Sequence, residues 1–217
     1  MPEHSTEGTR MNEDRLNTFE ALACSRRSIR RYRDEPVPRA LIERLLAIAG
    51  RAPSAHNRQP WRWAVITGDM RRRLADAMAV PFRRDLLADG VPVDEAERIV
   101  ARSRARISTA PVLILACLTM EDMDTYPDEH RRRNEWLMAA QSVALACQNL
   151  LLAAHAAGLG ACWLCAPLFC PQTVRDTLHL PETWEPQALI TLGWPANTGR
   201  DRPRHPVSTL TRWYDEA

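Results

Sequence analysis

The chain contains no lysine, so all 29 basic residues among its 217 residues are arginines. This absence excludes any mechanism that forms a Schiff base on lysine, and it excludes a phosphate-binding P-loop lysine. Arginine offers a planar fork of donors that binds phosphate or carboxylate through two hydrogen bonds. A GC-rich genome would produce the same bias, but an anionic ligand is easy to accommodate.

Long apolar runs and a glycine-rich nucleotide motif are also missing. No apolar run reaches the roughly 18 residues of a membrane span, and Met1 to Arg10 lacks the apolar stretch of a signal peptide. No G-x-G-x-x-G follows the first predicted strand, which disfavours the dinucleotide-binding fold. The net charge of +2 does not suggest nucleic-acid binding. We expect a soluble, cytoplasmic protein with a flexible arm over 1–12 and a single domain over 13–217.

The six cysteines include one C-x-x-C pair, Cys162 and Cys165, with Cys170 nearby. A zinc or iron–sulfur site would need a fourth ligand at suitable spacing, and none lies close in the sequence. The surrounding segment is apolar and typical of a strand. This pattern favours buried structural thiols over a metal or redox site, and we predict no metal.

Apolar periodicity predicts an α+β fold in which helices and strands alternate irregularly. Helical spacing predicts helices over 12–23, 38–50, 69–78, 93–106, 133–157 and 171–178. Short apolar runs predict strands over 61–67, 111–118, 161–166 and 188–192. Residues 81–92 are predicted to be irregular and the tail over 194–217 to be extended. The helix over 133–157 is apolar on most sides, which places it in a core or a subunit interface.

Two arginine-rich segments could bind one phosphate. The first has five polar side chains within six residues: Arg26, Arg27, Ser28, Arg30 and Arg31. Such a segment suits a phosphate, although it could also be a solvated basic turn. The second comprises Arg200, Arg202 and Arg204 in the tail. If the tail folds back, both segments would meet at the same anion.

Two further segments could contact a flat heterocycle. The loop over 51–63 joins a predicted helix to a predicted strand, and it offers Ser54, His56, Asn57 and Gln59 between prolines. Its amides suit a ring edge with alternating donors and acceptors, or the loop is an ordinary connection. Gly158-Leu159-Gly160 could let backbone N–H groups approach a ring closely, or it could simply end the preceding helix.

These segments, taken in order, resemble the FMN-dependent nitroreductase family. The similarity covers about residues 20–210, and the segment over 52–61 is its most specific part. The matching stretches are Arg26-Arg27-Ser28-Ile29-Arg30, Ala52-Pro53-Ser54-Ala55-His56-Asn57-Arg58-Gln59-Pro60-Trp61, Gly158-Leu159-Gly160-Ala161-Cys162-Trp163, Leu192-Gly193-Trp194-Pro195 and Arg202-Pro203-Arg204-His205-Pro206.

The resemblance implies an α+β, domain-swapped homodimer with a mostly antiparallel sheet flanked by helices and two FMN sites at the interface. It implies that Arg26, Arg27, Ser28, Arg30, Arg202 and Arg204 hold the phosphate and ribityl chain. Pro53, Ser54, Asn57 and Gln59 would reach the flavin, in part from the other protomer. Leu159 and Gly160 would lie against the isoalloxazine, and NAD(P)H could serve as the reductant.

A closer similarity, over residues 82–102, 126–128 and 180–186, is to the reductase domain that completes the deazaflavin coenzyme F-420. It implies reduction of the enolpyruvyl double bond of a dehydro precursor, with a separate glutamyl ligase as a pathway partner. The alternative is a general NAD(P)H-dependent nitroreductase or quinone reductase. An anionic substrate would suit a basic lid, and the substrate-contacting candidates are His56, Arg83, Arg84, Arg98, Arg102 and Tyr126. His56 and Tyr126 are also the candidate proton donors.

Overall fold

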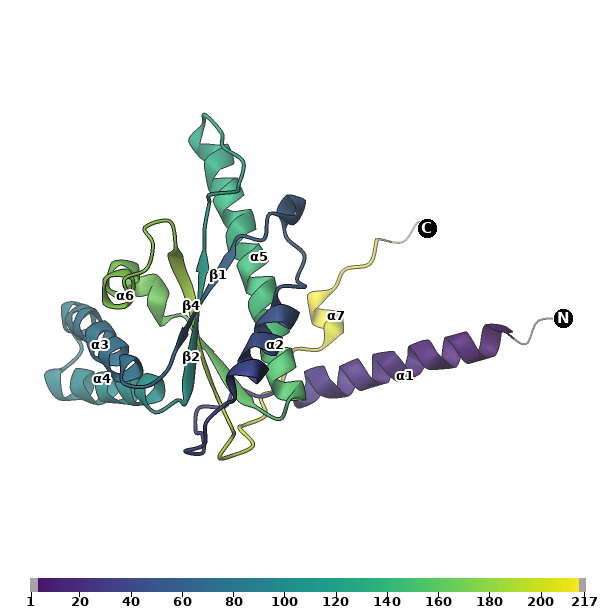
Figure 1. The fold of residues 1–217 in the computed structure, drawn as a ribbon, viewed down its shortest axis with the longest axis horizontal. Helices are drawn as coiled ribbons and strands as arrows, with labels where there is room; N and C mark the ends of the chain where they lie inside the picture. The colour runs from purple at the N-terminus through teal and green to yellow at the C-terminus, as the bar shows by residue number, and fades with distance from the viewer. Residues whose placement is uncertain (1–3, 215–217) are drawn as a thin grey trace.

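The computed structural model describes residues 4–214 and has a four-stranded antiparallel sheet at its centre (Figure 1). The strands lie in the order β1–β2–β4–β3, with β1 over Trp61–Ile66, β2 over Val112–Leu118, β3 over Gly160–Leu164 and β4 over Glu185–Gly193. Each neighbouring pair is antiparallel. The predicted α+β class is therefore confirmed, and all four predicted strands are present.

Helices cover both faces of this sheet, which is why the central strand β2 is buried along its whole length. Alternate residues of β2 supply the two cores, with Ile114 in the core under α2 and α5, and Leu115 in the core under α3, α4 and α6. The helices are α1 His4–Ser25, α2 Arg39–Ala49, α3 Met70–Ala88, α4 Val93–Ser108, α5 Glu129–Ala156, α6 Pro171–Leu178 and α7 Val207–Leu210, with 3-10 turns η1 Ala55–Asn57 and η2 Ala166–Phe169.

The longest helix, α5, is the core helix of one face. It begins four residues before the predicted start because Asp128 caps it, accepting a hydrogen bond from the Arg131 amide at 2.9 Å. Among the described residues, α5 is the one helix long and apolar enough to cross a membrane, and half of that stretch is buried in the fold. Nine of its residues pack into the core, as expected for the central helix of a folded domain.

The predicted end of α3 differs from the structure. Residues 81–88 are helical and not irregular, because α3 continues through Pro81 as far as Ala88, whereas residues 89–92 lie outside a helix as predicted. Proline costs a helix one hydrogen bond, but packing of the α3 continuation against α4 outweighs that loss. Asp69 occupies the N-cap position of α3, but its carboxylate forms an ion pair with Arg72 and no cap hydrogen bond.

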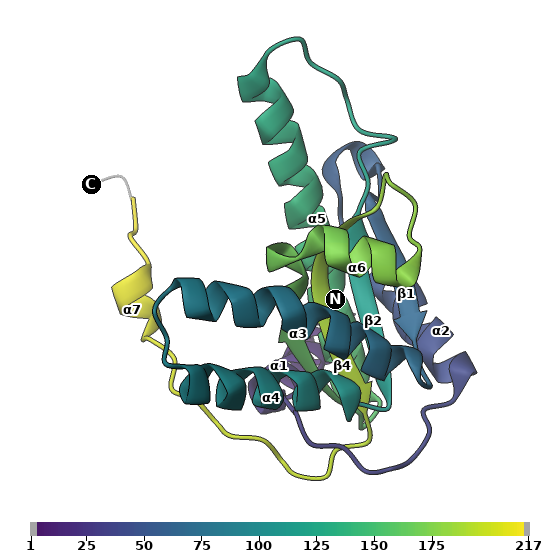
Figure 2. The ribbon, with the colours of Figure 1, turned by 90° about the vertical axis from the view of Figure 1, so that its left-hand side faces the viewer.

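The N-terminal segment is helical over much of the length expected to be a flexible arm. α1 starts at His4, so residues 4–12 are helical, while residues 1–3 of the expected arm lie outside the described residues. Figure 1 shows that α1 projects from the body of the molecule, and Figure 2 shows that the tail carrying α7 also extends away from it. Leu16 and Phe19 remain largely exposed on α1, so the sheet-centred core does not cover this helix.

The cysteines agree only partly with the prediction of buried thiols. Cys117, Cys147 and Cys162 are buried, and burial raises the pKa of Cys117 and of Cys147 to about 12. Cys165 is exposed, and its sulfur accepts a hydrogen bond from the indole N–H of Trp163 at 3.2 Å. Across residues 4–214, no cluster of three or more His, Cys, Asp or Glu side chains could hold a metal ion.

Gly193 at the end of β4 gives a first testable prediction. A Cβ there would lie 2.7 Å from Cγ and Cδ of Pro111 and 3.0 Å from Cδ1 of Tyr32. We expect Gly193→Ala to lower the free energy of unfolding by about 1–3 kcal/mol, because the packed neighbours must shift. Urea unfolding measures this loss. Gly50→Ala is the control, since a Cβ at Gly50 meets no atom nearer than 3.6 Å, and equal losses in both variants would contradict the packing argument.

Candidate functional site

Residues 28–33 extend the sheet beyond β3 and position the first arginine segment. Ser28 bridges to Ala161 in parallel, and the Ile29 amide donates to the Ala161 carbonyl at 3.0 Å. The Arg33 amide donates to the Trp194 carbonyl at 2.9 Å. These bonds hold the N-terminal segment between the sheet edge and the start of the tail.

The tail then folds back, and the two arginine segments line one cavity of about 500 Å³. Seven arginines and a single carboxylate line it, so its charge is strongly positive. The structure thus brings together six predicted phosphate-site residues. The full lining is Arg26, Arg27, Ser28, Arg30, Arg31, Asn197, Gly199, Arg200, Asp201, Arg202 and Arg204.

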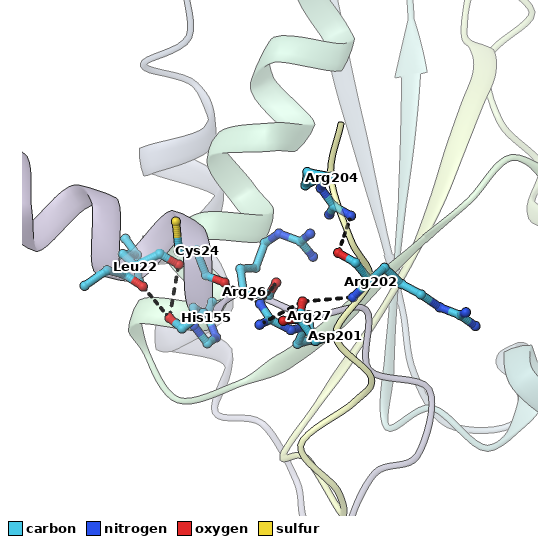
Figure 3. A network of polar contacts seen from close by, with 10 residues as sticks. Leu22, Cys24, Arg26, Arg27, His155, Asp201, Arg202 and Arg204 are labelled. Atoms are coloured by element: carbon cyan, nitrogen blue, oxygen red, sulfur yellow. Dashed lines mark hydrogen bonds and ion pairs between the residues drawn. The ribbon is translucent and has the colours of Figure 1, made fainter. Parts of the chain in front are cut away.

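Arg27 joins the two walls of this basic cavity (Figure 3). Its Nη2 lies 3.0 Å from Oδ1 of Asp201, and its Nη1 donates to the carbonyls of Cys24 and Arg26. Arg204 donates to the Arg202 carbonyl at 3.2 Å. Among the side chains of residues 12–214, none of the other six arginines of the cavity forms an ion pair, so their guanidinium groups are available to an anion.

Three cavity residues were not identified from the sequence: Asn197, Gly199 and Asp201. Gly199 has φ +74°, and a Cβ there would lie 2.8 Å from Cβ of Arg27, so only glycine lets the tail cross this closely. The Asn197 carboxamide oxygen accepts from the Gly199 amide at 3.3 Å. An Asn-x-Gly turn just before the Arg200–Arg204 segment was the available signal.

His155 lies beside the cavity at the end of α5. Its Nε2 is 2.8 Å from Oγ of Ser25, which ties α5 to the end of α1. Burial and the nearby charges of Arg26 and Arg27 lower the pKa of His155. His155 therefore stays neutral at neutral pH and adds no further positive charge to the arginine cluster.

The Gly158–Gly160 segment has a clear structural role. The Leu159 amide donates to the Ala154 carbonyl at 2.9 Å and Gly158 has φ +75°, which is a glycine cap that ends α5. Leu159 is buried in the core, and a Cβ on Gly160 would lie 2.7 Å from the Ile29 side chain. Contact of Leu159 and Gly160 with a ring stays a prediction.

The loop between α2 and β1 holds unusual backbone conformations. His56, Asn57 and Gln59 have φ of 48°, 54° and 51°, so three residues without glycine's freedom lie in the left-handed region. Ser54 supports the turn, since its Oγ accepts from the Gln59 amide at 3.0 Å. Pro53, His56, Asn57 and Gln59 are exposed. Strained, exposed polar groups of this kind gather at binding sites.

An ion pair holds this loop in place. Arg58 Nη2 lies 2.6 Å from Oδ1 of Asp124, and the amide of Asp124 donates to the buried carboxylate of Glu135 at 3.2 Å. The loop lies beside α5, away from the end of α5 that α1 approaches (Figure 1). Pro53, Ser54, His56, Asn57 and Gln59 do not line the basic cavity of the described chain.

The substrate candidates on α3 and α4 are mostly engaged within their own helix pair. Arg83 lies 2.5 Å from Glu97, Arg84 lies 2.8 Å from Asp85, and Arg98 donates to the Asp94 carbonyl at 3.2 Å. Arg102 is exposed. Tyr126 lies beneath Arg131, with 5.0 Å from the guanidinium carbon to the ring centre. The structure brings none of these residues to the lining of the basic cavity.

The ion pair between Arg58 and Asp124 gives a second prediction. Removing the carboxylate in Asp124→Ala should let the loop open more often, so that amides 57–59 exchange hydrogen about two- to fivefold faster. Hydrogen-exchange mass spectrometry measures this change. Asp69→Ala is the control, because Asp69 pairs with Arg72 on α3, away from the loop, and its loss should leave 57–59 unaffected. An unchanged rate in Asp124→Ala would remove the role given to this ion pair.

Several known proteins are similar to this chain in sequence and in fold. A model of the nitroreductase family matches residues 23–194. A Thermus thermophilus protein named NADH dehydrogenase is 31% identical, covering 88% of this chain and 93% of its own. A 5,6-dimethylbenzimidazole synthase of Rhodospirillum rubrum is also 31% identical, over 89% and 87% of the two chains.

A solved structure of similar fold points to the same family. It is a Desulfovibrio desulfuricans protein assigned as a nitroreductase and crystallised with FMN, which is 30% identical with a TM-score of 0.69 over 91% of this chain and 96% of its own. The predicted enzyme class, a flavin-dependent oxidoreductase, is confirmed by these similarities. The chain belongs to the nitroreductase family.

Proposed function

We propose that this protein is an FMN-dependent reductase that holds the FMN phosphate in the basic cavity and takes its electrons from NAD(P)H. The convergence of seven arginines on a cavity with one carboxylate carries the proposal. The FMN complex of the 30% identical relative and the NADH dehydrogenase name of another support it.

The residues of the cavity fit a phosphate well. A phosphate monoester carries up to two negative charges and several acceptor oxygens, which guanidinium forks match in geometry and charge. Arg26, Arg30, Arg202 and Arg204 are free to bind it, whereas Arg27 would first exchange its ion pair with Asp201. When bound, FMN supplies the redox chemistry, so the protein needs no nucleophile and base of its own.

We propose that a second subunit completes the site. Ser54, Asn57 and Gln59 belong to a strained, exposed loop that could contact the polar edge of a flavin. They do not line the basic cavity of their own chain, so they would contact a flavin bound to the other subunit. Three helices also carry exposed apolar side chains of the kind that a dimer interface covers: Leu16 and Phe19 of α1, Leu137 and Leu145 of α5, Val207 and Leu210 of α7.

Analytical ultracentrifugation tests the homodimer. Sedimentation as a monomer only, at micromolar concentration, would overturn it.

The acceptor we favour is a small nitroaromatic or quinone. Two arginines of α3 that could hold an anionic substrate, Arg83 and Arg84, already form ion pairs with Glu97 and Asp85. Arg98 donates to the Asp94 carbonyl at the start of α4, and Arg102 is exposed, so the helix pair offers little free positive charge for a basic lid. Reduction of a dehydro deazaflavin precursor is the second candidate. The sequence segments over 82–102 and 180–186 favour it, and a separate glutamyl ligase would then be a pathway partner.

Loss of a phosphate contact should weaken FMN binding. We expect Arg30→Ala and Arg204→Ala each to raise the FMN dissociation constant about tenfold or more, because each removes a charge-assisted hydrogen bond worth about 1.5–3 kcal/mol. Fluorescence titration of the apoprotein measures this constant. Arg73→Ala removes an exposed arginine of α3 outside the cavity and should change it less than about twofold. Equal effects at all three positions would remove the phosphate assignment.

Turnover separates the two candidate acceptors. With NADH or NADPH supplied, we expect rapid reduction of a nitroaromatic and a benzoquinone, and no two-hydrogen mass gain on the dehydro deazaflavin precursor. Mass spectrometry and NAD(P)H absorbance provide the readouts. A mass gain on the precursor with slow quinone turnover would favour the second candidate. Failure with every acceptor, despite bound FMN, would leave a flavin-binding protein without reductase function and overturn the proposal.

A further inference from the structure

A second cavity lies on the face of the sheet opposite α2 and α5. It has a volume of about 310 Å³, at the lower end of the roughly 300–1,000 Å³ of small-molecule sites. The α3–α4 helix pair forms its walls and η2 closes one side, and it shares no lining residue with the basic cavity. The lining residues that bear on its chemistry are Met78, Phe82, Asp89, Arg104, Phe169 and Cys170.

The body of this cavity is apolar and partly aromatic. Met78 and Ile107 are buried at its floor, while Phe82 and Phe169 remain 37% and 78% exposed. Exposure of two phenyl rings to water at one cavity is unfavourable, and the apolar ring of a bound ligand would cover them. The shape and lining therefore suit a small aromatic molecule.

The charge at one end of the cavity is negative. α3 ends there, with Asp85 in its last turn and Asp89 at its C-cap, and it has no basic residue in that turn. The end of a helix already carries partial negative charge, which basic residues usually offset. Arg84 pairs with Asp85 at 2.8 Å, but no basic side chain of residues 12–214 forms an ion pair with Asp89.

Two other polar side chains of the lining, Arg104 and Cys170, already have partners. Arg104 forms an ion pair with Asp76, so its positive charge is matched. The Cys170 thiol donates to the Ala166 carbonyl at 3.5 Å, and burial together with the charge of Asp85 raises its pKa. The thiol is therefore protonated and uncharged at neutral pH. The free charge that faces a ligand here is that of Asp89.

We propose that this cavity binds a small aromatic molecule that carries an ammonium group. Phe82 and Phe169 contact its ring, and Asp89 together with the end of α3 holds the ammonium group. Aromatic faces also attract a cation directly, which adds to the selectivity for positive charge. This site is separate from the flavin site in residues and in ligand chemistry, so it stands whether or not FMN binds in the basic cavity.

Three probes with the same indole ring and different charge test the site. Tryptamine is cationic, tryptophol is neutral and indole-3-acetate is anionic. In calorimetric titrations of the full protein with its bound flavin, we expect tryptamine to bind at least about fivefold more tightly than tryptophol, with indole-3-acetate weakest. Asp89→Asn should lower tryptamine affinity to the level of tryptophol. Asp34→Asn, which removes an exposed carboxylate outside the cavity, is the charge-matched control.

A second variant tests the location of the site. Ala79→Leu fills the cavity from α3 and should weaken all three probes, while flavin absorbance and reductase turnover stay unchanged. Three outcomes would overturn the proposal. These are equal affinity for the three probes, tryptamine binding that survives Ala79→Leu and perturbs the flavin spectrum, and a change of oligomeric state in Ala79→Leu, which would assign the cavity to a subunit interface.

Discussion

The backbone pairing of residues 28–33 with the edge of the sheet is the constraint on which the basic cavity depends. Ile29 bonds to β3 at Ala161, and on the other side Arg31 accepts from the Ala196 amide at 3.0 Å. One short segment is thus shared by the sheet and the tail. Because both partners are backbone groups, the placement of the arginines does not rely on flexible side chains. The backbone hydrogen bonds of Arg31 and Arg33 to Ala196 and Trp194 position the first residues of the tail, which then continues to the cavity.

Much of the fold could be predicted from local pattern. The β2 run from Val112 to Leu118 is apolar throughout because helices cover both of its faces, and α6 begins at a proline as its sequence indicates. The errors lie where tertiary contacts outweigh a local signal. Pro81 normally breaks a helix, but packing between α3 and α4 preserves this one. Such long-range packing cannot be read from a window of ten residues.

The candidate site was predictable to a different degree in each part. Clusters of arginine at 26–31 and 200–204 are visible in the sequence, and only the fold shows that they meet. The role of Asp201 was not predictable, since an isolated carboxylate among arginines gives no sign of its partner. The left-handed conformations of His56, Asn57 and Gln59 were equally hard to predict, because positive φ is uncommon for every residue but glycine, even though asparagine and histidine are enriched there. Its location away from the cavity follows from how α2 and β1 pack on α5.

The ion pair between Arg27 and Asp201 places a negative charge inside the basic cavity. It supplies the cavity with an internal counterion, so mutual repulsion among the arginines is reduced before any ligand arrives. An incoming anion must compete with this carboxylate, which lowers its net affinity but leaves the binding walls already assembled. If the cavity binds a phosphate as proposed, Asp201 is the group that the phosphate would displace and that would pair with Arg27 again when the phosphate leaves.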